Sequence, residues 1–184
     1  MLNSQNTFKL TTLRTLSRMN TIQIHKVLTK HVNYFQDVHP LDLLPSTLIK
    51  PAIIVISLDK HYMPSSHWVA VCFTDFGYAE YYDSCGLPPY KLEIVAYLLL
   101  HSICWIFNRH RLQGLTSNVC GHYCCLYVLH IARGLSMTSF VNMFIPARYT
   151  CKDKKAVRMF RAQFQLCPDG GRLEEQQQSC KPQI

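Results

Sequence analysis

The chain has 184 residues, of which 48% are hydrophobic, so it is long enough for one domain with an ample core. Its formal charge of +8 is spread along the sequence and does not mark a nucleic-acid-binding tail, and no apolar run approaches the roughly 20 residues that a membrane span needs. Nine scattered cysteines, an odd number, argue against a disulfide framework and indicate a reducing intracellular compartment, the cytoplasm or the nucleus.

The first half of the chain predicts a short helix followed by a loop. Residues 1–18 contain basic but no acidic residues and are expected to form a flexible leader. A helix is predicted from Thr21, since Ile24 and Leu28 recur at helical spacing. Residues 34–45 have two prolines and no hydrophobic period, which predicts a loop. The globular domain is expected to span residues 19–167.

Three strands and a helix are predicted next. Residues 52–58 form a β-branched run typical of a central strand that is buried on both faces. Residues 67–74 and 78–83 are expected to form a hairpin around the turn at 75–77. A helix is predicted over residues 90–102 and a short strand within 105–112. The inner face of that helix is expected to carry Leu92, Val95, Ala96 and Leu99.

The apolar run that follows Cys120 predicts a buried helix. Ser117 or Asn118 is expected to be its N-cap, and Gly134 stands where a C-cap glycine should be. A thiol in the first turn feels the positive end of the helix dipole, which favours the reactive thiolate. Gly121 is expected to leave the backbone beside Cys120 open to a substrate. The next two cysteines of the helix, Cys124 and Cys125, are expected to be core residues.

The C-terminal part predicts a helix over residues 137–144, an amphipathic helix over 153–165 and a disordered tail over 168–184. The exposed side of the amphipathic helix is basic, and it is expected to carry Lys152, Lys154, Lys155, Arg158 and Arg161. This side is either an ordinary solvated face or a track for the phosphate backbone of DNA.

The predicted hairpin places a histidine beside an aspartate. With a three-residue loop, Thr74 pairs with Tyr78 and His67 pairs with Cys85, so Asp83 is a diagonal neighbour of His67 on the same face. A two-residue loop would separate the two side chains onto opposite faces. Together with Cys120 they fit the logic of an acid, a base and a nucleophile.

Gln113 is the fourth candidate catalytic residue. A carboxamide NH2 near the nucleophile can donate to a developing oxyanion, together with the backbone N–H of Cys120 at the helix start. The alternative is that Gln113 is a solvent-facing loop residue.

Four separated motifs resemble the adenovirus protease (adenain), and more closely the adenain-like proteases of Maverick/Polinton DNA transposons. They are His67-Trp68, residues 82–89, Leu112-Gln113 and residues 117–124, in that order and with matching spacing. The resemblance covers about residues 19–165. It departs from the family at Asp37, where a glycine is usual, and at His39, where an aromatic residue is usual.

The resemblance implies an α+β fold, namely a papain-like cysteine protease fold in permuted order with a central mixed sheet, shared with SUMO-deconjugating proteases. It implies a thiol endopeptidase that cleaves after small residues, of Gly-Gly or Gly-Xaa type, in structural precursor proteins of a virus-like DNA element. The catalytic set would be His67, Asp83, Gln113 and Cys120, with no metal and no cofactor required for the chemistry. Packaging in virus-like particles fits this function.

Partners and alternative functions are open at this stage. DNA or a short peptide stimulates the adenoviral relatives, so DNA bound through Lys154, Lys155, Arg158 and Arg161 is an expectation, as are a polypeptide substrate, a monomer and no membrane contact. The alternatives are an isopeptidase that removes ubiquitin-like modifiers and an inactive nucleic-acid-binding protein. A zinc module built on Cys120, His122, Cys124, Cys125 and His130 would lack paired Cys-x-x-Cys ligands.

Overall fold

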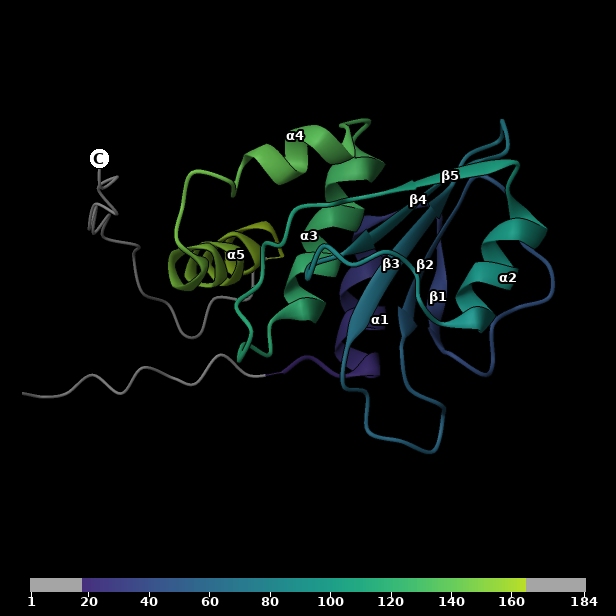
Figure 1. Cartoon of the computed structure of the whole chain (residues 1–184), viewed down its shortest axis with the longest axis horizontal. Helices are drawn as coiled ribbons and strands as arrows, with labels where there is room; N and C mark the ends of the chain where they lie inside the picture. Colours follow the sequence, from purple (N-terminus) through teal and green to yellow (C-terminus); the bar gives the residue numbers. More distant parts are fainter. Residues whose placement is uncertain (1–17, 165–184) are drawn as a thin grey trace, which may run out of the picture.

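The computed structural model describes residues 18–164 (Figure 1). The expected leader, except for its last residue, and the expected tail over 168–184 lie outside the described residues, as do residues 165–167 of the expected domain. Within the described part, no helix is both long and apolar enough to cross a bilayer.

Five strands form one mixed sheet in the order β1-β2-β3-β4-β5. The strands are β1 (Phe35–Pro40), β2 (Ala52–Ser57), β3 (Trp68–Phe73), β4 (Tyr78–Asp83) and β5 (Cys104–Phe107). The inner pairs are antiparallel, and both outer pairs, β1 with β2 and β4 with β5, are parallel. The predicted α+β class with a central mixed sheet is therefore confirmed.

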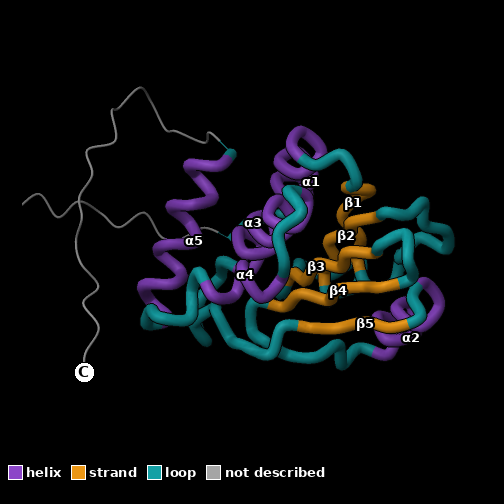
Figure 2. The backbone as a smooth tube through the Cα atoms, turned by 90° about the horizontal axis from the view of Figure 1, so that it is seen from above, coloured by secondary structure: helices purple, strands orange, loops and turns teal. Residues whose placement is uncertain are grey.

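Helices cover both faces of the sheet (Figures 1 and 2). They are α1 (Thr21–His31), α2 (Leu92–His101), α3 (Cys120–Ala132), α4 (Met137–Asn142) and α5 (Tyr149–Gln163). The larger core lies between one face and α1, α3, α4 and α5, and the smaller core lies between the other face and α2. Alternate residues of β2 and β3 enter the two cores, which explains why both strands are buried throughout.

The central helix α3 is buried on nearly all sides, as its apolar sequence predicts. Its C-terminal glycine is confirmed, because Gly134 has a φ of 76° just beyond the last turn. The predicted N-cap is wrong: Val119 occupies that position without a side-chain bond. The reason is a preceding turn, in which the Ser117 N–H donates to the Gly114 carbonyl at 3.2 Å and ends the loop before the helix begins.

The predicted loop over 34–45 contains the strand β1, so that prediction is wrong. The strand pairs in parallel with β2 at the sheet edge, and a bulge between Phe35 and Asp37 breaks the period-two pattern that would have revealed it. Only Val38 of β1 is buried, and Pro40 stands at its end, where an edge strand tolerates proline.

The predicted inner face of α2 is also wrong. Leu92 and Leu99 are 81% and 68% exposed, whereas Ile94, Tyr97 and Leu98 are buried. The ring of Tyr97 packs edge-on against Phe73 of β3, with 5.9 Å between centroids. This contact directs the side of α2 that carries Tyr97 toward the sheet.

Helix α5 begins at Tyr149, four residues earlier than predicted. This extension buries Lys152, which was expected on the basic exposed face, and its ammonium lies 4.7 Å from the ring centroid of Tyr149. The predicted amphipathic character of this helix is confirmed, because its apolar residues Val157, Phe160 and Phe164 are buried.

The two limits of the described chain meet at one cavity. Met19, just before α1, and Phe164, just after α5, both line a cavity of about 430 Å³ between these helices. Arg18 donates to the carbonyls of Ser65 and Ser66, and the indole of Trp68 donates to the Met19 carbonyl at 3.1 Å. These bonds tie the start of the described chain to the segment that leads into β3.

Candidate active site

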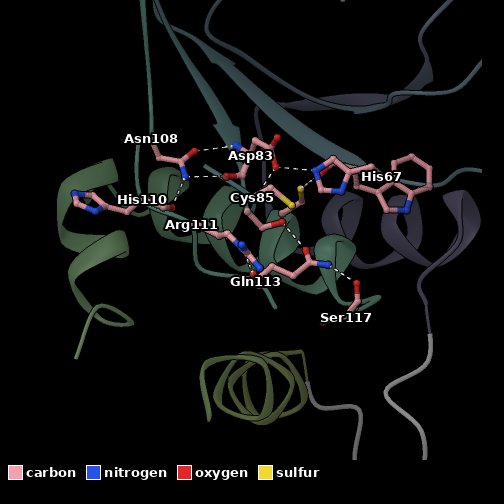
Figure 3. Close-up of polar contacts among 11 residues, drawn as sticks. His67, Asp83, Cys85, Asn108, His110, Arg111, Gln113 and Ser117 are labelled. Atoms are coloured by element: carbon pink, nitrogen blue, oxygen red, sulfur yellow. Dashed lines mark hydrogen bonds and ion pairs between the residues drawn. The ribbon is translucent and has the colours of Figure 1, made fainter. Parts of the chain in front are cut away.

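The hairpin brings His67 and Asp83 together. The Thr74 N–H donates to the Tyr78 carbonyl at 2.9 Å, and Val69 pairs with Asp83, which is the register of the predicted three-residue loop. His67 immediately precedes β3, and its Nε2 lies 2.7 Å from Oδ1 of Asp83 at the end of β4 (Figure 3). The predicted proximity of the two side chains is confirmed.

Asp83 is held on several sides and is fully buried. The side chain of Asn108 clamps its backbone, accepting from the Asp83 N–H at 2.8 Å and donating to the Asp83 carbonyl at 2.7 Å (Figure 3). The Cys85 N–H donates to Oδ1 of Asp83 at 2.7 Å. Sequence reasoning missed Asn108, whose only signal is a polar side chain directly after the strand that pairs with β4.

The environment of His67 favours its protonated form. Burial lowers the pKa of His67, but hydrogen bonds with Asp83, Cys120 and Cys85 outweigh burial and raise the pKa. Because Nε2 faces Asp83, Nδ1 is the ring nitrogen left for a thiol. An imidazolium held between a carboxylate and a thiol stabilises a thiolate beside it.

Cys120 is the first residue of α3 and is 2% exposed. Gly121 does not leave the adjacent backbone open as expected, because a Cβ there would lie 2.9 Å from Cβ of Met19. Its role is close packing of the start of α1 against α3.

The next two cysteines of α3 are buried, which confirms them as core residues. Cys124 donates its thiol to the Trp68 carbonyl at 3.2 Å, and burial raises the pKa of both Cys124 and Cys125. These two thiols therefore stay protonated, and Cys120 is the helix thiol that contacts the histidine.

Gln113 is 3% exposed, which excludes the solvent-facing alternative. The Ser84 hydroxyl donates to Oε1 of Gln113 at 2.7 Å, and Nε2 donates to the Ser117 carbonyl at 2.6 Å (Figure 3). The serine thus fixes which end of the carboxamide carries the NH2 group, and this group points to the turn before Cys120. Sequence reasoning also missed Ser84.

Among residues 18–164, one group of potential metal ligands lies close together: His67, Asp83 and Cys85. The five residues of the alternative zinc module on α3 do not form such a group there. Instead, the ring of His122 packs edge-on against Phe160, with 4.8 Å between centroids.

No family model matches the chain, and no curated protein matches it.

Several solved structures are similar in part. The central domain of the uncharacterized Lpg1148 protein from Legionella pneumophila matches with a TM-score of 0.47 and 15% identity, over 82% of this chain and 97% of that chain. The SUMO protease Ulp1 matches with a TM-score of 0.42 and 16% identity, over 79% of this chain and 80% of that chain. The ASFV pS273R protease matches with a TM-score of 0.38 and 20% identity, over 68% of this chain and 48% of that chain.

The basic face of α5 is smaller than predicted. Lys154, Arg158 and Arg161 are exposed, but Lys155 is half-buried and donates its ammonium to the Met143 carbonyl at 2.6 Å. The exposed cations Lys154, Arg158 and Arg161 are spaced by four and three residues, so they lie on one side of α5.

Proposed function

We propose that the chain is a thiol peptidase whose triad is Cys120, His67 and Asp83. The observation that carries this proposal is a fully buried carboxylate bonded to a histidine that also contacts the thiol at the start of a helix. Nucleophile, base and orienting acid are thus in one chain of contacts, as covalent catalysis by a thiol requires.

In the proposed first half-reaction, the thiol proton resides on His67, and the thiolate of Cys120 attacks the carbonyl carbon of the scissile bond. The C–S bond forms, and the carbonyl electrons move onto oxygen. Gln113 Nε2 and the Cys120 N–H are the proposed donors to this oxyanion, since N–H groups of a first helical turn have no partner within the helix. The amine leaves with the proton of His67, and a thioester remains.

Water completes the proposed cycle. His67, now neutral, takes a proton from water, the resulting hydroxide attacks the thioester, and the C–S bond breaks to release the acid. Asp83 stays ionised throughout and stabilises the imidazolium on each occasion that it forms.

The resemblance to adenain-like proteases supports a finer proposal for the substrate. We propose cleavage after small residues, of Gly-Gly or Gly-Xaa type, in structural precursor proteins of a virus-like DNA element, within a papain-like fold in permuted order. The competing substrate is a ubiquitin-like modifier joined to a lysine. Ulp1, a SUMO protease, is one of the similar structures.

The test compares the wild type with Cys120→Ala on a peptide library and on an isopeptide-linked ubiquitin-like protein. Cys104→Ala, which removes an exposed thiol of β5, is the matched control. We expect the wild type and the control to cleave peptides after small residues and Cys120→Ala to be inactive. Cleavage of the isopeptide-linked protein alone would mean that the substrate is a ubiquitin-like modifier and not a precursor protein. Equal activity of all three proteins would overturn the proposed mechanism.

A further inference from the structure

A second thiol lies in the candidate active site and has no role in the proposed reaction. Cys85 follows Asp83 by two residues, and its Sγ, one carboxylate oxygen of Asp83 and one ring nitrogen of His67 all lie within 4.8 Å of one another (Figure 3). The side chains of His67 and Asp83 are 20% and 0% exposed, and Cys85 is half-buried. The cluster is therefore sheltered but reachable from solvent.

We propose that these three residues form a zinc site that inhibits the peptidase when it is filled. One thiolate, one imidazole and one carboxylate match the ligands that zinc takes in proteins, whereas magnesium and calcium prefer oxygen ligands alone. Three protein ligands leave one position of a tetrahedral ion for water or for a further thiolate. The inhibitory part of the proposal rests on the proposed function, but the binding part does not.

The surroundings of the cluster favour a metal site. Oδ2 of Asp83 is buried and has no hydrogen-bond partner in the described part of the chain, so the carboxylate keeps unused capacity for a cation. The Asn108 clamp and the Cys85 N–H fix the position of the carboxylate, as outer partners of metal ligands commonly do.

The turn that carries Cys85 is fixed as well. Gly86 has a φ of 70°, and a Cβ there would lie 2.7 Å from the backbone nitrogen of Arg111, so the turn packs directly on the segment between β5 and Gln113. Tetrahedral bonds of about 2.0–2.3 Å hold two ligand atoms more than about 3 Å apart, so the pair of His67 and Asp83, now 2.7 Å apart, has to open slightly, and the Cys85 sulfur has to move to a matching distance from both. The Cys85 side chain can supply this shift by rotation about its Cα–Cβ bond.

Zinc at this site would block the proposed chemistry. Binding displaces the proton of the Cys85 thiol and a proton of the His67 ring, which both pass to solvent. An imidazole that donates its lone pair to zinc cannot take the proton of Cys120. Inhibition is therefore reversible, and a chelator restores the activity.

Cobalt(II) is the probe for binding, because a thiolate ligand gives it a charge-transfer absorption that does not depend on catalysis. We expect the wild type to bind one cobalt ion with this absorption, and zinc to displace it. Cys85→Ser and Cys85→Ala should lose the absorption and bind at least about tenfold more weakly. Cys104→Ser, which changes an exposed thiol outside the cluster, should bind like the wild type.

Inhibition is measured in the same proteins, each relative to its own rate in chelator. The zinc concentration for half inhibition should rise at least about tenfold in both Cys85 variants and stay unchanged in Cys104→Ser. Equal cobalt absorption in the wild type and the Cys85 variants, or no binding at one equivalent, would overturn the site. If cobalt binds through Cys85 but the protein hydrolyses no peptide, the metal site stands and the proposed function is wrong. If the protein hydrolyses peptides but binds no cobalt through Cys85, the proposed function stands and the metal site is wrong.

Discussion

At the scale of the single residue, Asp83 controls which ring nitrogen of His67 carries a proton. A carboxylate that accepts from Nε2 leaves Nδ1 able to take the proton of Cys120. In Asp83→Asn the amide can donate to Nε2 instead, so the proton moves to the wrong nitrogen. We expect kcat/KM to fall by on the order of 10³ to 10⁴ while thermal unfolding shows a folded protein.

Asp75→Asn is the control for this prediction, since it makes the same chemical change at an exposed position in the turn of the same hairpin. It should leave kcat/KM as in the wild type. An Asp83→Asn protein with unchanged kcat/KM would show that Asp83 is only a turn residue.

Gln113 is expected to act mainly in the transition state. Gln113→Glu keeps the size of the side chain and still accepts from Ser84, but it lacks the NH2 donor. We expect kcat to fall by an amount equivalent to about 3 kcal/mol with little change in KM. Steady-state kinetics on a short peptide measure both constants, and a rise in KM alone would make Gln113 a substrate contact instead.

His122 predicts a loss of stability in mild acid. Burial, and then the nearby charge of Arg161, lower the pKa of His122 to about 4. The unfolded chain binds a proton at this histidine near pH 6.5, but the folded chain does so only near pH 4, so the free energy of unfolding falls as the pH drops through this window. His122→Phe should remove up to about 3 kcal/mol of this fall.

Urea unfolding at several pH values between 7 and 4 measures the effect. His110→Phe, which changes an exposed histidine, should keep the slope of the wild type. A wild-type slope in His122→Phe would mean that His122 does not titrate differently in the folded and unfolded chains.

At the scale of the element, the sequence predicted best where one pattern decides the structure. The β-branched run of β2 and the apolar run of α3 are apolar on all sides, so it is not necessary to decide which side is buried. Both elements were predicted correctly. The leucines of α2 point all round the helix, so only the contact of Tyr97 with Phe73 decides which side is buried. Strand β1 owes its existence to pairing with β2, which no local pattern reveals.

Helix α5 carries the prediction about DNA. If its exposed cations follow the phosphate backbone, affinity for arbitrary duplex DNA falls linearly with salt on logarithmic axes. Replacing Lys154 and Arg158 by Glu should make the slope of log affinity against log salt concentration less steep by about two. Lys60→Glu, in an exposed loop, should leave this slope unchanged. Peptide hydrolysis without DNA should be unaffected in all three proteins.

Salt titration of binding to a labelled duplex measures this slope. If the wild type does not bind DNA in dilute salt, the DNA hypothesis is wrong, and the +8 charge contributes to solubility alone.

At the scale of the whole molecule, the candidate site joins segments that are far apart in the sequence. The parity of the hairpin was enough to predict that His67 meets Asp83, because strand pairing has a fixed period. Asn108, Ser84 and Cys85 could not be assigned to the site in this way. Their contacts depend on how the segment after β5 packs against the turn after β4, and neither segment has a repeating pattern.

The cavity shared by Met19 and Phe164 has a topological consequence. Since the two limits of the described chain line one cavity, a short linker could join them, and the backbone would become a ring. Such a ring can be opened in an exposed loop at the other end of the sheet from His67, such as the connection between β1 and β2 that contains Ile49, which is 84% exposed. The contacts around His67 do not depend on where the chain begins, so circular permutants of this protein should fold with the same site.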